Sequence, residues 1–149
     1  MTKEEKDLLF SDLCSRFPYG VKISKTIENF VSSPHSIRSI NSNNVIIEDG
    51  EFEDGTPDID VWDIENVKPY LFPLSSMTEE QKKFFKDRPI FLDFENELVV
   101  KEDFFGNSQF TMLDDWMEVI LWLLKNHFDW RGLIPKGLAI DCTNLNIYN

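Results

Sequence analysis

The fold of this chain is decided by one short stretch, Ile37-Arg38-Ser39-Ile40-Asn41-Ser42-Asn43-Asn44-Val45-Ile46-Ile47. Its two ends are rich in isoleucine and valine, which favour strands. Its middle, residues 41–44, consists of asparagine and serine, which favour turns. The stretch therefore predicts a β-hairpin and places the β-rich part of the chain around it.

Further short strands are expected on both sides of this hairpin. Residues 21–24 alternate apolar and polar positions, as a half-buried strand does. On the other side, two Asp-Gly turn signals are followed by three apolar residues among acids, Ile59, Val61 and Ile64. Four or five short strands within residues 19–70 predict a small antiparallel barrel of the SH3-like kind or a strongly bent antiparallel sheet.

Helical and irregular segments flank this β unit. Residues 3–16 are predicted to form a helix, because Thr2 and Glu5 have the spacing of a capping box and Pro18 ends the segment. Residues 67–74 contain two prolines and predict an ordered connector without regular structure.

The C-terminal half is expected to contain two helices, a short hairpin and a loop-rich tail. In chain order these are a helix from Ser76 or Thr78 to about Lys86, strands at residues 90–94 and 97–100, a helix over residues 112 to about 126 with Thr111 as N-cap, and a tail over residues 128–149 with one strand at 138–141. The fold class is therefore α+β. We expect a single compact domain over residues 1–149, which divides, if at all, into residues 1–74 and 75–149.

The negative charge of the chain is concentrated in one segment. Formal net charge is −12, and 9 of the 27 acidic residues lie within residues 48–65, which contain no Lys or Arg. They are Glu48, Asp49, Glu51, Glu53, Asp54, Asp58, Asp60, Asp63 and Glu65. The acidity argues against direct binding of nucleic-acid phosphates and of anionic membranes. A protein partner is expected instead.

Compartment and redox state follow from simpler features. The charged N-terminus does not resemble a signal peptide, and the longest apolar run, residues 119–124, is too short to cross a bilayer. Cys14 and Cys142 are interpreted as free thiols in a reducing cytoplasm, with a pairing that ties the two ends of the chain as the alternative.

Three interpretations of the acidic segment are open. It is a solvated outer face with acidic turns, a functional acidic surface, or a calcium site. An EF-hand loop beginning at Asp58 would need glycine at its sixth position, where the chain has Asp63, so no metal or cofactor is predicted. A functional surface, carried by Glu51, Glu53, Asp58, Asp60 and Asp63, could imitate the charge spacing of a nucleic acid and occupy a basic groove.

The long helix contains an anomaly at Trp122. An apolar stripe is predicted at Leu113, Met117, Ile120 and Leu124, broadened by Trp116 and Leu123. Trp122 falls in the middle of the opposite side, which also carries Asp115, Glu118 and Asn126. Either the tail folds over Trp122, or Trp122 is an exposed anchor for a partner.

The segment after this helix concentrates side chains that are capable of chemistry. His127 and Asp129 could act as acid and base, and Arg131 could bind an anion. The favoured alternative is structural: His127 caps the helix as a cation, and Asp129 pairs with Arg131. Because no nucleophile or phosphate-binding loop accompanies these residues, no catalytic residue is predicted.

Three stretches of the chain resemble a known group of proteins. They are residues 67–81, residues 127–139, which begin His127-Phe128-Asp129-Trp130, and residues 13–21. These stretches are similar to uncharacterised small proteins of Bacteroidales phages and prophages. The resemblance implies a bacterial cytoplasm and a mobile-element context, and it carries no active residues.

The sequence thus supports three hypotheses about function. The first is a non-enzymatic protein-interaction protein that uses an aromatic surface around Trp122, Trp130 and Arg131, or a face of the β unit. The alternative is an acidic inhibitor of a host nucleic-acid enzyme. The third, and least favoured, is a hydrolase or transferase.

Overall fold

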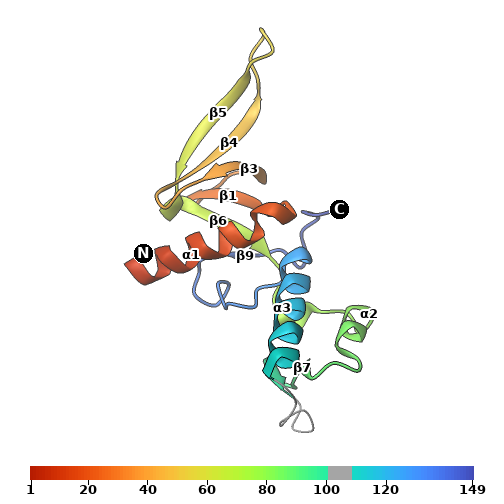
Figure 1. The fold of residues 1–149 in the computed structure, drawn as a ribbon. Coiled ribbons are helices and arrows are strands. Elements are labelled where there is room, and N and C mark those ends of the chain that lie inside the picture. The colour runs from red at the N-terminus through yellow and green to blue at the C-terminus, as the bar shows by residue number, and fades with distance from the viewer. Residues whose placement is uncertain (101–108) are drawn as a thin grey trace.

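The centre of the molecule is a mixed β-sheet (Figure 1). This computed structural model describes residues 1–100 and 109–149. The strands of the sheet are β1 (Lys22–Ile27), β2 (Phe30–Val31), β3 (His35–Ile40), β4 (Asn44–Glu51), β5 (Pro57–Asp63), β6 (Val67–Leu71) and β9 (Ile140–Asp141). Their order is β5-β4-β3-β1-β6-β9, and β2 pairs with β1 alone.

The sheet is open and does not close into a barrel. Neighbouring strands are antiparallel, except that β9 returns from the tail and lies parallel to β6. Within the described residues, no pairing joins β5 to β9, the two ends of the order. The α+β class and the hairpin of β3 and β4 are confirmed, whereas a closed barrel is wrong. A β-bulge shifts the β3–β4 register between Ile37 and Ser39.

Helix α1 (Lys3–Arg16) forms where the sequence predicts it and packs on the sheet (Figure 1). The hydroxyl oxygen of Thr2 accepts the backbone N–H of Glu5, and the Glu5 carboxylate accepts the N–H of Thr2, which completes the capping box. Leu9 and Leu13 of the helix are fully buried against the sheet residues Ile23 and Ile47. This first core cluster also takes in Leu133 and Leu138 of the tail.

The prediction of a connector without regular structure at residues 67–74 is wrong for its first five residues. Residues 67–71 form strand β6, which pairs with β1 through Ile23 and Pro69 and with β9 through Tyr70 and Leu71. In the described chain, the pairing of β6 with β9 begins only at Tyr70, so Pro69 lies where one edge of β6 is unpaired. A strand tolerates proline at such a position because no N–H is required there.

The second half contains shorter elements and one long helix. They are α2 (Glu79–Lys82), β7 (Ile90–Leu92), β8 (Leu98–Val100) and α3 (Gln109–Lys125), with 3₁₀ turns at Leu74–Ser76 and Lys83–Phe85. Two further 3₁₀ turns, Phe17–Tyr19 and Ile64–Asn66, lie in the first half. The hairpin of β7 and β8 is confirmed. Thr111 lies inside α3, so the prediction that it caps this helix is wrong. Among the described residues, none of the helices has the length and hydropathy needed to cross a bilayer.

The buried face of α3 differs from the predicted stripe. Val119 and Leu123 are fully buried in a second core cluster, and Trp116 and Trp122 pack against it. Leu113 and Met117, expected to be core residues, are 58% and 56% exposed. Apolar residues surround most of this helix, so their periodicity alone could not select the face that is covered.

Candidate functional site

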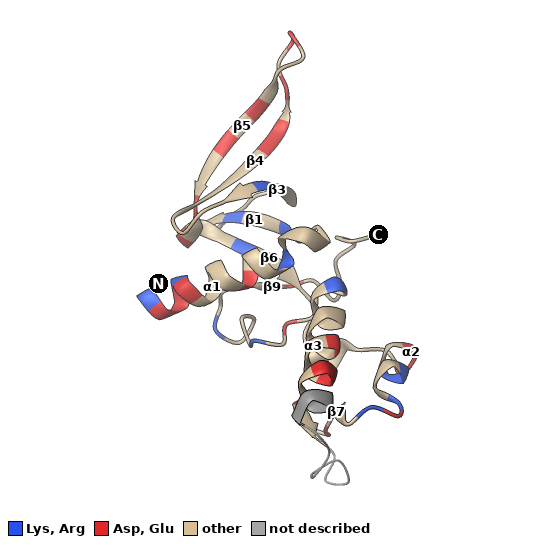
Figure 2. Cartoon of the chain, viewed as in Figure 1, with Lys and Arg blue, Asp and Glu red and all other residues tan. Residues whose placement is uncertain are grey.

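The acidic segment forms a hairpin that projects beyond the rest of the sheet (Figures 1 and 2). Strands β4 and β5 supply its two arms, and residues 52–56 form the turn at its tip. Eight of the nine acids of residues 48–65 lie on this hairpin, and Glu65 follows it in the turn Ile64–Asn66. All nine are exposed except Asp58, which is half-buried. At the tip, Asp54 accepts the hydroxyl and the N–H of Thr56, and these hydrogen bonds lower the pKa of Asp54. The charges of the hairpin are therefore held on a folded element.

These carboxylates do not share one face. Trp62 is buried on the core side of β5, and alternation along the strand places Asp58 and Asp60 on that side. Ile59 and Val61 then lie on the opposite side, together with Asp63. The prediction that Asp58 and Asp60 alternate on one face agrees with the strand, but Asp63 lies across from them.

Two acids of the hairpin arms are paired with basic side chains. The Arg38 guanidinium lies 2.7 Å from the Glu48 carboxylate. The Nε2 atom of His35 lies 3.1 Å from an oxygen of Asp49. Glu51 and Glu53, nearer the tip, pair with no basic side chain within the described residues. Asp58, Asp60 and Asp63 on β5 also have no basic partner among the described residues, so the free charge of the hairpin lies at its tip and along β5.

Apolar side chains are exposed among these acids. Phe52 at the tip is 57% exposed, and Ile59 and Val61 on the outer face of β5 are 46% and 55% exposed. In register with them on β4 are Glu48, opposite Ile59, and Ile46, opposite Val61. The outer face therefore combines an apolar stripe with carboxylates.

On the free edge of β5, one backbone donor is already bonded to a side chain of the same strand. Asp60 accepts the backbone N–H of Val61 at 2.9 Å and the indole N–H of Trp62 at 2.7 Å. An edge donor that is already bonded cannot pair with an incoming strand, and a charge at this position is a common protection against such pairing. The N–H of Val61 is therefore not available to an added strand.

Trp122 is half-buried and packs against the second core cluster. Its ring stacks on Phe84 with centroids 4.4 Å apart and on Phe128 at 5.7 Å, and it meets the edge of Phe85. The cover comes from the segment after α2 and from the first residue of the predicted tail. The geometry thus agrees with the interpretation that Trp122 is covered.

His127 ends helix α3 as a neutral residue. Its N–H bonds the carbonyl of Leu124 while the N–H of Phe128 bonds that of Leu123, the pattern of a Schellman C-cap. His127 has the left-handed φ of 61° that this position requires and stacks on Tyr148 at 3.7 Å. Burial, followed by the nearby charge of Arg16, lowers the pKa of His127 to about 4. The prediction that His127 caps the C-terminus of this helix is confirmed, whereas the positive charge expected of it there is wrong.

Asp129 and Arg131 serve different parts of the structure. The Asp129 carboxylate accepts the N–H groups of Leu133 and Ile134, both at 2.8 Å, and so shapes the loop. Arg131 stacks over the Trp130 ring at 4.7 Å, with its Nε atom 3.8 Å from Asp12. The predicted pairing of Asp129 with Arg131 is wrong, because backbone donors already bind the carboxylate.

A pocket of about 710 Å³ lies beside Trp130. Four segments and one helix residue line it: residues 73–75, 95–98, 129–132 and 134–135, and Trp116 of α3. Trp130 and Arg131 were candidates from the sequence, whereas Trp116 and the carboxylates Glu95 and Glu97 were not. No local signal marks them, because they come together only when the β7–β8 hairpin folds against α3. His127 is not among the lining residues, so the acid, base and anion clamp of the enzyme hypothesis do not meet here.

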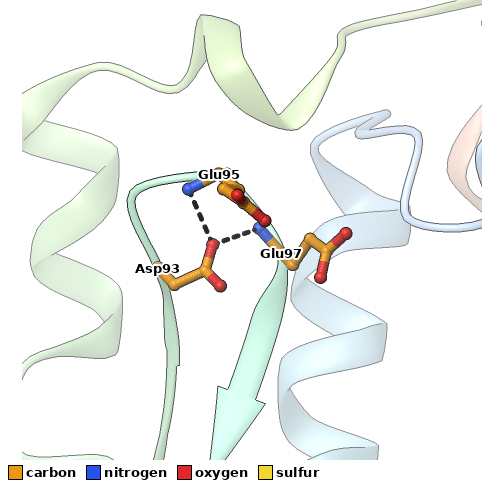
Figure 3. A group of neighbouring side chains, drawn as sticks. All are labelled: Asp93, Glu95 and Glu97. Carbon is orange, nitrogen blue, oxygen red and sulfur yellow. Dashed lines mark hydrogen bonds between the residues drawn. The ribbon is translucent and has the colours of Figure 1, made fainter.

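The β7–β8 turn at the rim of this pocket gathers three carboxylates (Figure 3). An oxygen of Asp93 accepts the N–H groups of Glu95 and Glu97 at 2.8 and 2.9 Å. Side-chain oxygens of the three residues lie within 4.8 Å of one another. Since the turn itself uses the Asp93 carboxylate, the two glutamates supply the charge that faces outward.

Comparison with known proteins adds no further guide. The chain matches no family model, no curated protein and no solved structure. The resemblance to phage proteins stays a prediction, and function has to be argued from the geometry.

The position of His127 predicts how stability depends on pH. Its pKa of about 4 in the folded chain is below the ordinary 6.5, so between these pH values the unfolded chain binds a proton that the folded chain does not. Stability should be full above pH 6.5 and fall by about 3 kcal/mol as the pH drops to 4. Urea unfolding across this range measures the loss.

The matched variants are His127→Asn and His35→Asn. Asparagine does not titrate and tolerates the left-handed backbone, so the first variant should lose this part of the pH dependence while the second keeps it. An unchanged pH profile in His127→Asn would contradict the prediction.

Proposed function

We propose that this chain is a non-enzymatic protein-interaction protein whose β4–β5 hairpin binds a partner protein. The observation that carries the proposal is the outer face of the hairpin, where Ile59 and Val61 are exposed side by side among carboxylates. The partner surface that fits it has an apolar centre and a basic rim.

Burial of the exposed apolar groups would supply the free energy of binding. Single exposed apolar side chains are common on protein surfaces. Here Phe52, Ile59 and Val61 lie on one projecting element, and covering each of them is worth about 1–2 kcal/mol. The unpaired acids near the tip would add long-range attraction to a basic partner and speed the encounter.

The same geometry gives less support to the acidic inhibitor. A side chain array that imitates a nucleic acid needs its carboxylates on one continuous face, whereas those of this hairpin lie on two faces. Glu48 and Asp49 are also engaged by Arg38 and His35. A contact that mixes apolar and acidic groups therefore fits the hairpin better.

Three further features belong to this proposal. The setting is a bacterial cytoplasm and the origin is a mobile element, both supported by the three stretches that resemble phage proteins. The third is a structural similarity of strands β1–β5 to SH3-like sheets. It is supported by the short length of these strands and by their antiparallel pairing.

The proposal is tested by affinity capture from a bacterial lysate with the wild-type chain and two matched variants. Ile59→Ser/Val61→Ser alters the hairpin, and Leu113→Ser/Met117→Ser alters a similarly exposed apolar pair on α3. A partner of the hairpin should bind about tenfold more weakly to the first variant and equally well to the second. The capture is repeated at low and high salt.

The salt series separates the two hypotheses. A partner held mainly by apolar contact survives high salt and is lost with Ile59→Ser/Val61→Ser. A partner that high salt removes, and that the same variant retains, supports the acidic inhibitor instead. Equal capture by all three proteins at every salt concentration contradicts both.

A further inference from the structure

The pocket beside Trp130 is distant from the acidic hairpin and offers a second site. The hairpin projects from one end of the molecule, and β7, whose turn forms the rim of the pocket, lies at the other (Figure 1). The volume of the pocket, about 710 Å³, falls within the range of known ligand sites, roughly 300–1,000 Å³. It is larger than one side chain needs and has room for a short stretch of peptide.

The walls of the pocket favour an organic cation. Trp116 comes from α3 and Trp130 from the loop after it, and the faces of tryptophan rings attract cationic groups more strongly than other aromatic rings do. Arg131 already lies over the Trp130 ring at 4.7 Å, so Trp116 is the ring that remains for a ligand cation. Pro73, Pro135 and Leu98 add apolar surface. Such walls pack against the aliphatic stem of an arginine or lysine while its charged end is held elsewhere.

The rim of the pocket supplies that charge. Glu95 and Glu97 are exposed, and within residues 1–100 and 109–149 no basic side chain lies at ion-pair distance from either. The lining also contains Arg131, but its guanidinium is stacked on Trp130 and faces the buried carboxylate of Asp12. The Asp129 carboxylate accepts two backbone N–H groups and keeps its negative charge. The lining therefore carries three carboxylates against one guanidinium, and its net charge is negative.

A neighbouring side chain offers further contact area to a peptide occupant. Phe94, in the same turn as Glu95, is 93% exposed. A peptide that continues past Glu95 would cover this ring and gain the free energy of its burial. A small free cation would leave both this ring and most of the pocket uncovered.

We propose that the pocket between Trp116, Trp130 and the β7–β8 turn binds an extended peptide segment of a partner protein, with an arginine or lysine side chain held by Glu95 and Glu97. The cation lies against the Trp116 ring, and the flanking residues of the peptide fill the rest of the pocket. This site does not depend on the proposed role of the hairpin.

The test uses heteronuclear NMR of the full chain, in which each tryptophan indole N–H is a separate reporter. The probe is the capped peptide acetyl-Gly-Arg-Gly-amide. The indole signals of Trp116 and Trp130 should shift with an affinity in the millimolar range, which is usual for so short a ligand. The signals of Trp62, in the hairpin, and of Trp122, in the core, should stay in place.

Two comparisons test the charge. The citrulline analogue of the peptide keeps the shape of arginine without its charge and should bind about tenfold more weakly. Glu95→Gln/Glu97→Gln should weaken the arginine peptide about fivefold, whereas Glu79→Gln/Glu80→Gln, two exposed acids on α2, should leave its affinity unchanged.

Other outcomes overturn the proposal. Equal binding of the citrulline peptide would make the site one for neutral ligands. Agmatine binding as tightly as the peptide would make it a site for small cations. Shifts confined to Trp62, or no shifts at millimolar peptide, would mean that the pocket does not bind a basic peptide.

Discussion

Replacing Asp12 with alanine is expected to lower the free energy of unfolding by about 3–5 kcal/mol. The Asp12 carboxylate lies 2.7 Å from Nε of Arg16, and neither side chain is exposed. Arg16 also donates to the carbonyl of Phe128 at 2.7 Å, so the pair joins α1 to the end of α3. Without the carboxylate, a buried guanidinium charge would have no counter-charge this close. Urea unfolding monitored by circular dichroism measures the change.

The matched control is Asp7→Ala, an exposed aspartate on the same helix, which should change stability by less than about 0.5 kcal/mol. A second variant, Asp12→Leu/Arg16→Met, removes both charges at once. Because apolar residues of similar volume avoid the cost of burying charge, it should recover most of the loss. Equal stability of Asp12→Ala and Asp7→Ala would show that the buried pair contributes little.

The elements that sequence reasoning placed correctly are those with local signals. Helix α1 has both of its ends marked, by Thr2 and Glu5 at the start and by Pro18 just after the end. The turn of the β3–β4 hairpin is indicated by four consecutive Asn and Ser residues, 41–44. In each case the residues that determine the structure are neighbours in the sequence.

Strand β6 and the closure of the sheet depend on distant residues. The prolines of residues 67–74 predict irregular structure, and only the return of β9 about seventy residues later decides which edge of β6 is paired. Strand β9 is also the last strand of the sheet order, so in the described residues the sheet ends there and does not close into a barrel. No periodicity within residues 19–70 could have indicated this.

The candidate sites divide in the same way. The exposure of the acidic hairpin follows from its turn signals and charge, and was predictable. The division of its acids between two faces requires the register of β5, which places Trp62 in the core. The pocket joins four loops and α3, so its tryptophan and glutamate residues share no sequence pattern.

Trp122→Ala is expected to destabilise the chain by about 3–5 kcal/mol, comparable to other losses of a packed aromatic ring. The Trp122 ring stacks between Phe84 and Phe128. Removing it leaves a cavity, and each phenylalanine ring loses its contact with Trp122. It also removes aromatic contacts whose value exceeds that of the buried area alone. Thermal and urea unfolding should both report the loss.

The neighbouring residue supplies the control for Trp122. Leu121 is 43% exposed on another side of α3, and Leu121→Ala should cost much less, about 0.5 kcal/mol. A Trp122→Ala chain that unfolds like the wild type but no longer captures its partner would mean that this ring is an anchor. A large loss of stability, with Leu121→Ala nearly silent, assigns Trp122 to the core. Recognition in the pocket then rests on Trp116, Trp130 and Phe94, and recognition at the hairpin tip on Phe52.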